Sequence, residues 1–111
     1  ERVMATVHVS AHPLVRHKVA RLRATDTRPP EFRELVAGIS RALFLDATAD
    51  LPVRPVAVRT PLADTTCEEI AVRVGLVPVL RAGLGMADAM LQALPEASVW
   101  HLGLYRDHAT L

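Results

Sequence analysis

The stretch LVPVLRAGLGMAD, residues 76–88, decides how this chain folds. It runs from an apolar segment into a single arginine, Arg81, and then into two glycines that flank a leucine. A continuous apolar run bounded by turn residues is typical of a strand that is covered on both faces. Residues 74–80 are therefore predicted to form a buried strand that ends at the arginine. Because Pro78 has no backbone N–H, regular pairing is expected to end there.

The residues after this turn complete a strand–helix–strand unit. Apolar residues recur at helical spacing from Met86 to Leu94, and Pro95 stops the helix. SVWHLGLY, residues 98–105, is predicted to be a second buried strand. Two strands joined by a helix within about 32 residues form a βαβ unit, whose handedness makes the strands parallel neighbours or near neighbours. The fold class is therefore α/β.

The N-terminal half is predicted to be mainly helical. Residues 3–9 are expected to form a short strand or an ordered arm. The dipeptide at 12–13, His-Pro, indicates a helix start, because the fixed φ of proline suits the first helical position, and this helix is expected over 13–24. A second helix over 30–49 carries the apolar stripe of an amphipathic helix, formed by Phe32, Leu35, Val36, Ile39 and Leu43.

The middle of the chain is richer in turn and polar residues. Val56–Val58 is expected to be a short strand near a sheet edge, because Pro52 and Pro55 flank or interrupt it. Residues 60–73 are expected to be a polar excursion or a surface hairpin. The two preceding helices would then cover the sheet or dock against another element, and residues 1–111 would belong to a single domain.

The composition is that of a soluble globular domain. Half of the residues are hydrophobic, and the mean hydropathy of +0.22 argues against disorder. Thirteen basic and twelve acidic residues give a net charge of +1, which does not favour a nucleic-acid-binding surface. No apolar run approaches the roughly 20 residues of a membrane-spanning helix, and no signal peptide is recognised. Cys67 is the only cysteine, which excludes an internal disulfide and favours the reducing cytoplasm.

Two arginines follow the two predicted strands and form the candidate site. Arg81 follows VPVL, and Arg106 follows LGLY. The carboxyl ends of parallel strands lie at one edge of the sheet, where open α/β sheets bind ligands. Gly83 and Gly85 open the next helix, where glycine permits unusual φ values and lets a ligand approach backbone N–H groups. Since the arginine fork matches phosphate oxygens, the pair predicts a site for a multiply charged anion.

Simpler interpretations stay open for these residues. Each arginine alone also fits a solvated loop charge or an ion pair with Asp88 or Asp107. GLGMAD matches a dinucleotide-binding fingerprint only in part, because Asp88 stands where the third glycine belongs. Met86, Met90 and Trp100 are expected to be core residues.

Other chemically active residues show no catalytic or metal-binding pattern. His8, His12 and His17 are interpreted as capping or surface residues, since no cysteine or carboxylate cluster accompanies them. The pair Glu68–Glu69 is interpreted as solvated. Cys67 has no evident histidine base, so a nucleophilic role is not expected.

Five blocks of the sequence resemble the N-terminal half of the uracil phosphoribosyltransferase family. They are, in chain order, HPLVRHKVARLR (12–23), EFRELV (31–36), DATADLP (46–52), VPVLRAGLGMADAML (77–91) and HLGLYRD (101–107). The combination of LRAGLGM with LYRD is the most specific part. The chain departs from the family pattern at Asp46, where members often have Glu, and at Ala89, where they often have Gly.

The resemblance implies the type I phosphoribosyltransferase fold, a parallel sheet flanked by helices with extra N-terminal elements. It implies transfer of ribose 5-phosphate from phosphoribosyl pyrophosphate to N1 of uracil, giving UMP and pyrophosphate in pyrimidine salvage. Mg²⁺ would be bound largely through the substrate. By resemblance, Arg81, Ala82 and Gly83 belong to the loop that holds the pyrophosphate, and Arg106 is a second arginine on the same substrate. None of these is expected to be a catalytic side chain.

The family's remaining binding elements fall further along its chain than residue 111. Residues 1–111 are therefore expected to be the N-terminal portion of a phosphoribosyltransferase domain, inactive alone, in a homodimer or higher homo-oligomer. Two alternatives stay open. One is a non-catalytic, pyrimidine-responsive regulator on the same fold. The other is an oligomerisation fragment whose helices over 13–24 and 30–49 pack against another subunit.

Overall fold

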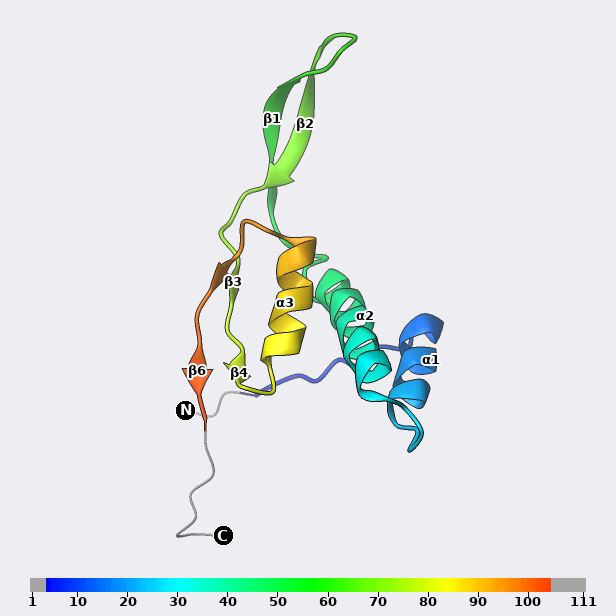
Figure 1. Cartoon of the computed structure of the whole chain (residues 1–111). Coiled ribbons are helices and arrows are strands. Elements are labelled where there is room, and N and C mark those ends of the chain that lie inside the picture. Colours follow the sequence, from blue (N-terminus) through cyan, green and yellow to red (C-terminus); the bar gives the residue numbers. More distant parts are fainter. Residues whose placement is uncertain (1–3, 105–111) are drawn as a thin grey trace.

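The computed structural model describes residues 4–104, which form three helices and three pairs of strands (Figure 1). In chain order the elements are α1 (Pro13–Leu22), α2 (Pro29–Ala47), β1 (Val53–Arg59), β2 (Asp64–Ile70), β3 (Gly75–Leu76), β4 (Val79–Leu80), α3 (Leu84–Ala93), β5 (Ser98–Val99) and β6 (Leu102–Gly103). The layers follow one another from the short strands through α3 and α2 to α1 (Figure 1). Within the described part of the chain, no helix is long and apolar enough to cross a membrane.

The predicted strand–helix–strand unit is confirmed. β3 pairs with β5, and β4 pairs with β6; both pairs are parallel, and α3 connects them. The strand expected over residues 74–80 is divided at Pro78 into β3 and β4. Pairing nevertheless continues across the division, because Trp100 N–H donates to Leu76 O at 2.8 Å and Leu102 N–H donates to Pro78 O at 3.1 Å. Proline removes its own donor but keeps its carbonyl, so the interruption is local.

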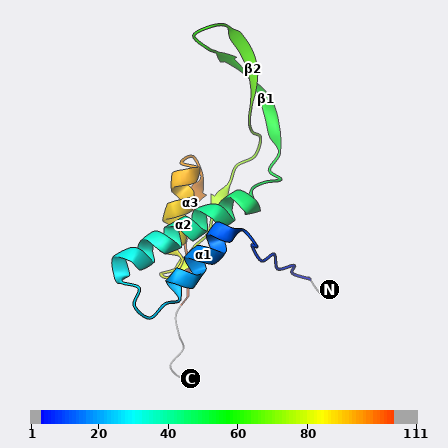
Figure 2. The same cartoon turned by 90° about the vertical axis from the view of Figure 1, so that its right-hand side faces the viewer.

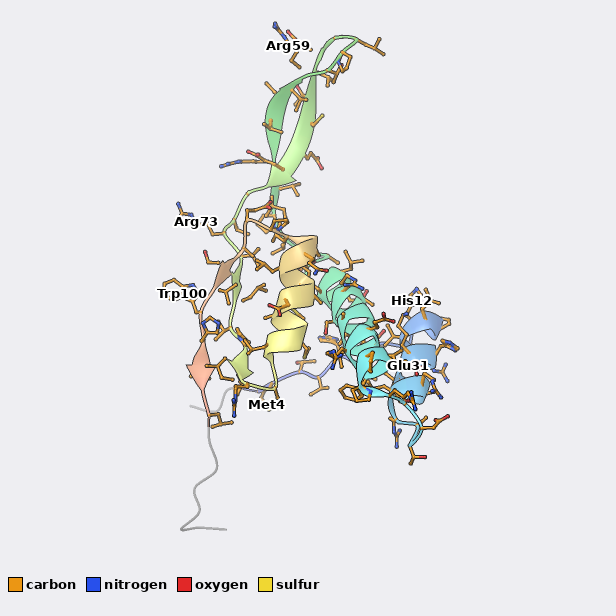
Figure 3. The ribbon with its side chains drawn as sticks, viewed as in Figure 1. Met4, His12, Glu31, Arg59, Arg73 and Trp100 are labelled. Atoms are coloured by element: carbon orange, nitrogen blue, oxygen red, sulfur yellow. The ribbon has the colours of Figure 1, made fainter. Side chains whose placement is uncertain are left out.

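Only one face of these strands is covered by α3. Leu76 and Pro78 are buried, whereas Val79 is 40% exposed. The prediction that residues 74–80 are covered on both faces is therefore wrong within the described structure. The expectation that Met86 and Trp100 are core residues is wrong too, because Met86 is 39% exposed and Trp100 is 67% exposed, with a side chain that points away from α3 (Figure 3). Successive side chains of a strand point to opposite faces, so covering one face leaves every second residue open.

The tightest helix packing lies between α2 and α3. Ser40 and Phe44 of α2 are buried, and Ala89 of α3 is only 2% exposed. The helix predicted over 30–49 is thus confirmed, but the buried side chains of α2 differ from the predicted stripe. Phe32 is 46% exposed, because it borders an open cavity at the amino end of α3 instead of packing in the core.

An arginine holds the junction between α1 and α2 together. Arg21 donates from Nε to Glu31 Oε1 at 2.5 Å and from Nη2 to Glu31 Oε2 at 3.1 Å. Its Nη1 donates to Asp26 Oδ1 at 3.1 Å. The hydrogen bonds from Arg21 lower the pKa of Glu31, and those carboxylates in turn raise the pKa of Arg21. At the other end of α1, His12 Nδ1 accepts from Leu14 N–H at 3.2 Å, which confirms the predicted helix start.

The hairpin formed by β1 and β2 projects from the body of the molecule (Figures 1 and 2). Its antiparallel register runs from Val53 opposite Ile70 to Arg59 opposite Asp64. The expected strand at 56–58 is therefore confirmed, but the expected hairpin over 60–73 is wrong in its bounds, because those residues supply only the turn and the second strand and β1 supplies the first. Residues 4–12, in contrast, are extended but unpaired among the described residues, which fits an arm rather than a strand.

We predict that Ala89→Leu destabilises the full-length protein by about 1–3 kcal/mol, because the added carbons do not fit between α2 and α3. The matched control is Ala93→Leu, since Ala93 is an exposed residue in the last turn of the same helix. Chemical unfolding measures both variants. Equal stabilities of the two variants would contradict this account of the interface.

We also predict a pH-dependent contribution from the Arg21–Glu31 pair. Because the folded-state pKa of Glu31 is lowered, the stabilisation is complete above the unfolded-state pKa of about 4.3 and is lost as pH falls through the lower folded-state value. The unfolding free energy of Glu31→Gln should therefore approach that of the wild type only at acidic pH. Glu34→Gln, at an exposed position of α2, is the control and should show no such convergence.

Candidate functional site

A tight turn joins the end of β4 to the start of α3. Gly83 N–H donates to Val79 O at 2.9 Å, and Leu84 N–H donates to Arg81 O at 3.1 Å. The peptide bond between Leu80 and Arg81 is cis. The turn thus folds back onto the strand from which it came, and it carries the exposed residues Arg81 and Ala82 at its apex.

Position 83 requires glycine because there is no room for a side chain, and not because of its backbone conformation. Its φ of −76° and ψ of −8° are open to any residue, and no glycine among residues 4–104 has a positive φ. A Cβ atom at this position would lie 2.9 Å from both N and O of Val79 and 3.2 Å from Cβ of Pro78. The expectation that glycine supplies an unusual φ is therefore wrong. What matters is the missing side chain, which allows the turn to lie against the strand.

The amino end of α3 offers hydrogen-bond donors beside Arg81. Among residues 4–104, the N–H groups of Ala82, Gly85 and Met86 have no protein acceptor. In the same part of the chain, no carboxylate lies within ion-pair distance of Arg81, so the alternative pairing with Asp88 is not formed. An arginine side chain next to the amino end of a helix favours binding of an anion, because both carry positive charge and unsatisfied hydrogen-bond donors.

Arg106, the second arginine of the predicted pair, lies outside the described residues. The arrangement of strands on which that prediction rests is nevertheless present. β4 and β6 are parallel neighbours, with Leu80 opposite Gly103, so the two strands end at the same edge. That Arg81 and Arg106 bind one ligand stays a prediction.

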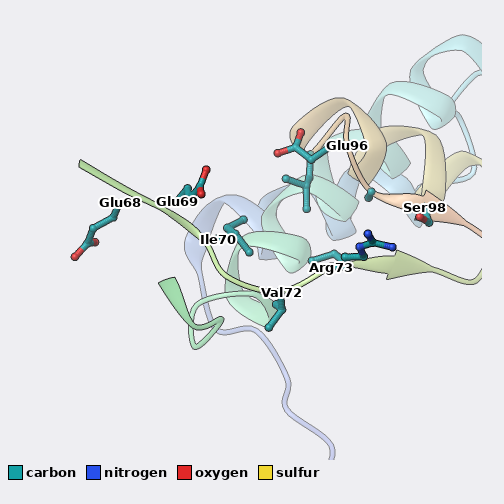
Figure 4. Close-up of a pocket in the computed structure, with 10 residues that line it drawn as sticks. Glu68, Glu69, Ile70, Val72, Arg73, Glu96 and Ser98 are labelled. Atoms are coloured by element: carbon teal, nitrogen blue, oxygen red, sulfur yellow. The ribbon is translucent and has the colours of Figure 1, made fainter. Parts of the chain in front are cut away.

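A second depression, of about 640 Å³, lies at the base of the hairpin (Figure 4). Glu68, Glu69, Arg73, Glu96 and Ser98 are among its lining residues. It sits at the amino ends of β3 and β5, whereas ligands of open α/β sheets bind at the carboxyl ends. Three carboxylates also make it unsuitable for phosphates. This depression is therefore not the predicted anion site.

The remaining singled-out residues lie away from the turn. Glu69 accepts a hydrogen bond from Arg54 Nε at 2.9 Å across the hairpin, and Glu68 is exposed. Cys67 is exposed on β2. Within the described residues, no group of three or more His, Cys, Asp or Glu side chains is placed to hold a metal ion.

The support beneath the turn is not evident from the periodicity of the sequence. Val79 supplies the carbonyl that accepts from Gly83, and Pro78 supplies the surface against which Gly83 lies. A proline inside an apolar strand, followed five residues later by a glycine, was the available signal. From the sequence alone, this pattern indicates only an interruption of pairing.

Together, the parallel strands and the turn define an α/β protein with an exposed, arginine-bearing turn at the carboxyl edge of its strands. The sequence profile of the family described as "Uracil phosphoribosyltransferase" matches residues 9–111. The chain therefore belongs to the uracil phosphoribosyltransferase family.

Individual relatives agree with this assignment. The chain is 56% identical over 108 residues to the uracil phosphoribosyltransferase of Roseiflexus castenholzii and 50% identical over 109 residues to that of Desulfitobacterium hafniense. Each alignment covers 97% of this chain and 52% of the relative. The structure of the AQ2163 protein from Aquifex aeolicus matches with a TM-score of 0.84 at 33% identity, over 95% of this chain and 50% of that one. The chain thus spans about half the length of the curated relatives it matches.

We predict opposite outcomes for two glycines of the turn and helix start. Gly83→Ala should destabilise the full-length protein by about 1–3 kcal/mol, because its Cβ would overlap the backbone of Val79. Gly85→Ala is the matched control. A Cβ there would lie 3.8 Å from Cγ1 of Val36, an ordinary contact, and alanine favours the helix by up to about 1 kcal/mol. Urea unfolding of both variants tests the difference, and a neutral Gly83→Ala would refute the spatial argument.

Proposed function

We propose that the protein containing this chain is a uracil phosphoribosyltransferase, which converts uracil and phosphoribosyl pyrophosphate into UMP and pyrophosphate. The observation that carries the proposal is the family match across residues 9–111, which includes the turn at Arg81. In this reaction the bond between ribose C1 and the pyrophosphate oxygen breaks, a bond from uracil N1 to C1 forms, and the N1 proton is released.

The turn suits the leaving-group side of that reaction. Negative charge grows on the departing pyrophosphate, so donors that are already in place stabilise the transition state more than the ground state. Arg81 would supply a planar fork for two phosphate oxygens, and the N–H group of Ala82 would supply a further donor. Gly83 would contribute by letting the turn close. Arg106 is proposed as the second arginine on the same substrate.

We propose that Mg²⁺ enters with the substrate. The described residues provide no cluster of protein ligands for it, whereas Mg²⁺ commonly binds through substrate phosphates and waters. The proposed role of this chain's residues is therefore to hold the pyrophosphate group rather than the ion.

We further propose that residues 1–111 form the N-terminal part of one phosphoribosyltransferase domain, in a cytoplasmic homodimer or higher homo-oligomer. The coverage of 52% of each relative supports the first part. The projecting hairpin supports self-association, because an isolated two-stranded hairpin is only marginally stable in water and a second copy would cover it. Light scattering after size-exclusion chromatography of the full-length protein tests the oligomeric state.

For the proposed reaction, we predict that Arg81→Ala lowers kcat/KM for phosphoribosyl pyrophosphate by about 10²–10³-fold, because both charge and fork geometry disappear. Arg81→Lys should fall between this variant and the wild type, since it restores the charge alone. UMP formation from labelled uracil by the full-length protein measures the effect.

The control for charge removal is Arg41→Ala. Arg41 is exposed on α2 and only reaches Gln92 Oε1 at 3.4 Å, so its loss should leave the kinetics unchanged. Wild-type kinetics for Arg81→Ala would reject the role of Arg81. Absence of UMP formation by the wild type would reject the proposed function itself.

A further inference from the structure

Pro78 is buried within a paired strand segment where proline is costly. Parallel strands bond through alternate residues, each of which accepts at its carbonyl and donates at its N–H. Pro78 O accepts from Leu102 N–H at 3.1 Å, so an N–H at position 78 would face the carbonyl of Trp100. Among the described residues, nothing donates to that carbonyl. The strand therefore lacks one of the regular hydrogen bonds between parallel strands at this position.

Pro78 lies beside the glycine of the turn. Cβ of Pro78 lies 3.2 Å from the place where a Cβ on Gly83 would stand. Pro78 also directly precedes Val79, whose carbonyl accepts from Gly83 N–H. Because the ring fixes φ at position 78, the backbone that leads into Val79 has one free rotation fewer than it would have with another residue. The same residue thus lies against the turn and restricts the backbone that leads into the residue that anchors it.

We propose that Pro78 is a positioning residue for the turn that carries Arg81, held in place of a strand-forming residue so that its rigid ring supports Gly83. The identification of the ligand as a pyrophosphate group rests on the proposed function. The hydrogen bond from Leu102 to Pro78 ties this residue to β6, the neighbouring strand. The position of the turn is therefore set by both parallel strands and not by β4 alone.

The test replaces Pro78 by valine in the full-length protein. Valine restores the N–H, favours strands and keeps a similar bulk, so a purely structural role predicts unchanged or higher stability and unchanged binding. A positioning role predicts instead that the Kd for pyrophosphate and the KM for phosphoribosyl pyrophosphate rise about tenfold, since small misplacements of binding groups are costly. The KM for uracil and the melting temperature should stay near their wild-type values.

Pro78→Ala is the second variant, in case valine disturbs folding, and Pro95→Ala is the matched control at an exposed turn beyond α3. Calorimetric titration with pyrophosphate gives the binding constants independently of turnover. Unchanged pyrophosphate binding in both Pro78 variants overturns the proposal, and so does a wild type that binds no pyrophosphate. A fall in melting temperature together with both KM values rising also overturns it. If the wild type binds pyrophosphate in a Pro78-dependent way but forms no UMP, the proposed reaction fails and the positioning role stands.

Discussion

The hydrogen bond from Gly83 N–H to Val79 O is the constraint on which the site depends. It brings the start of α3 back onto the strand that precedes it, and it leaves Arg81 and Ala82 exposed at the carboxyl edge. The bond can form only because position 83 has no side chain. The absence of one carbon atom therefore allows the chain to close the turn instead of continuing away from the sheet.

The helices fix the other end of this turn. α3 is held against α2 by small side chains, with Ala89 and Ser40 almost completely buried. A helix packed this closely cannot slide without steric overlap, because protein interiors have little free volume. The turn thus lies between a paired strand and a closely packed helix. This explains how an exposed loop of three residues can present its donors in a fixed arrangement.

The sequence predicted the elements well and their environments less well. The parallel pairing and the position of Arg81 followed from periodicity and turn residues, which are local properties. Trp100 was misjudged, because hydrophobicity shows that a side chain prefers burial but not which element is present to cover it. The role of Gly83 was misjudged for a related reason, since a steric limit imposed by Val79 depends on how the chain folds back. Such contacts cannot be predicted from the spacing of residues in the sequence alone.

Val79 links the site to the open face of the strands. Its carbonyl anchors the turn, while its side chain is 40% exposed on the side that α3 does not cover. Leu102, its partner in the register, is 55% exposed as well. Parallel strands in folded proteins are normally covered on both faces, so an element that covers this side would contact the residue that anchors the turn. Covering this face of the strands would therefore also restrain the turn, because Val79 takes part in both contacts.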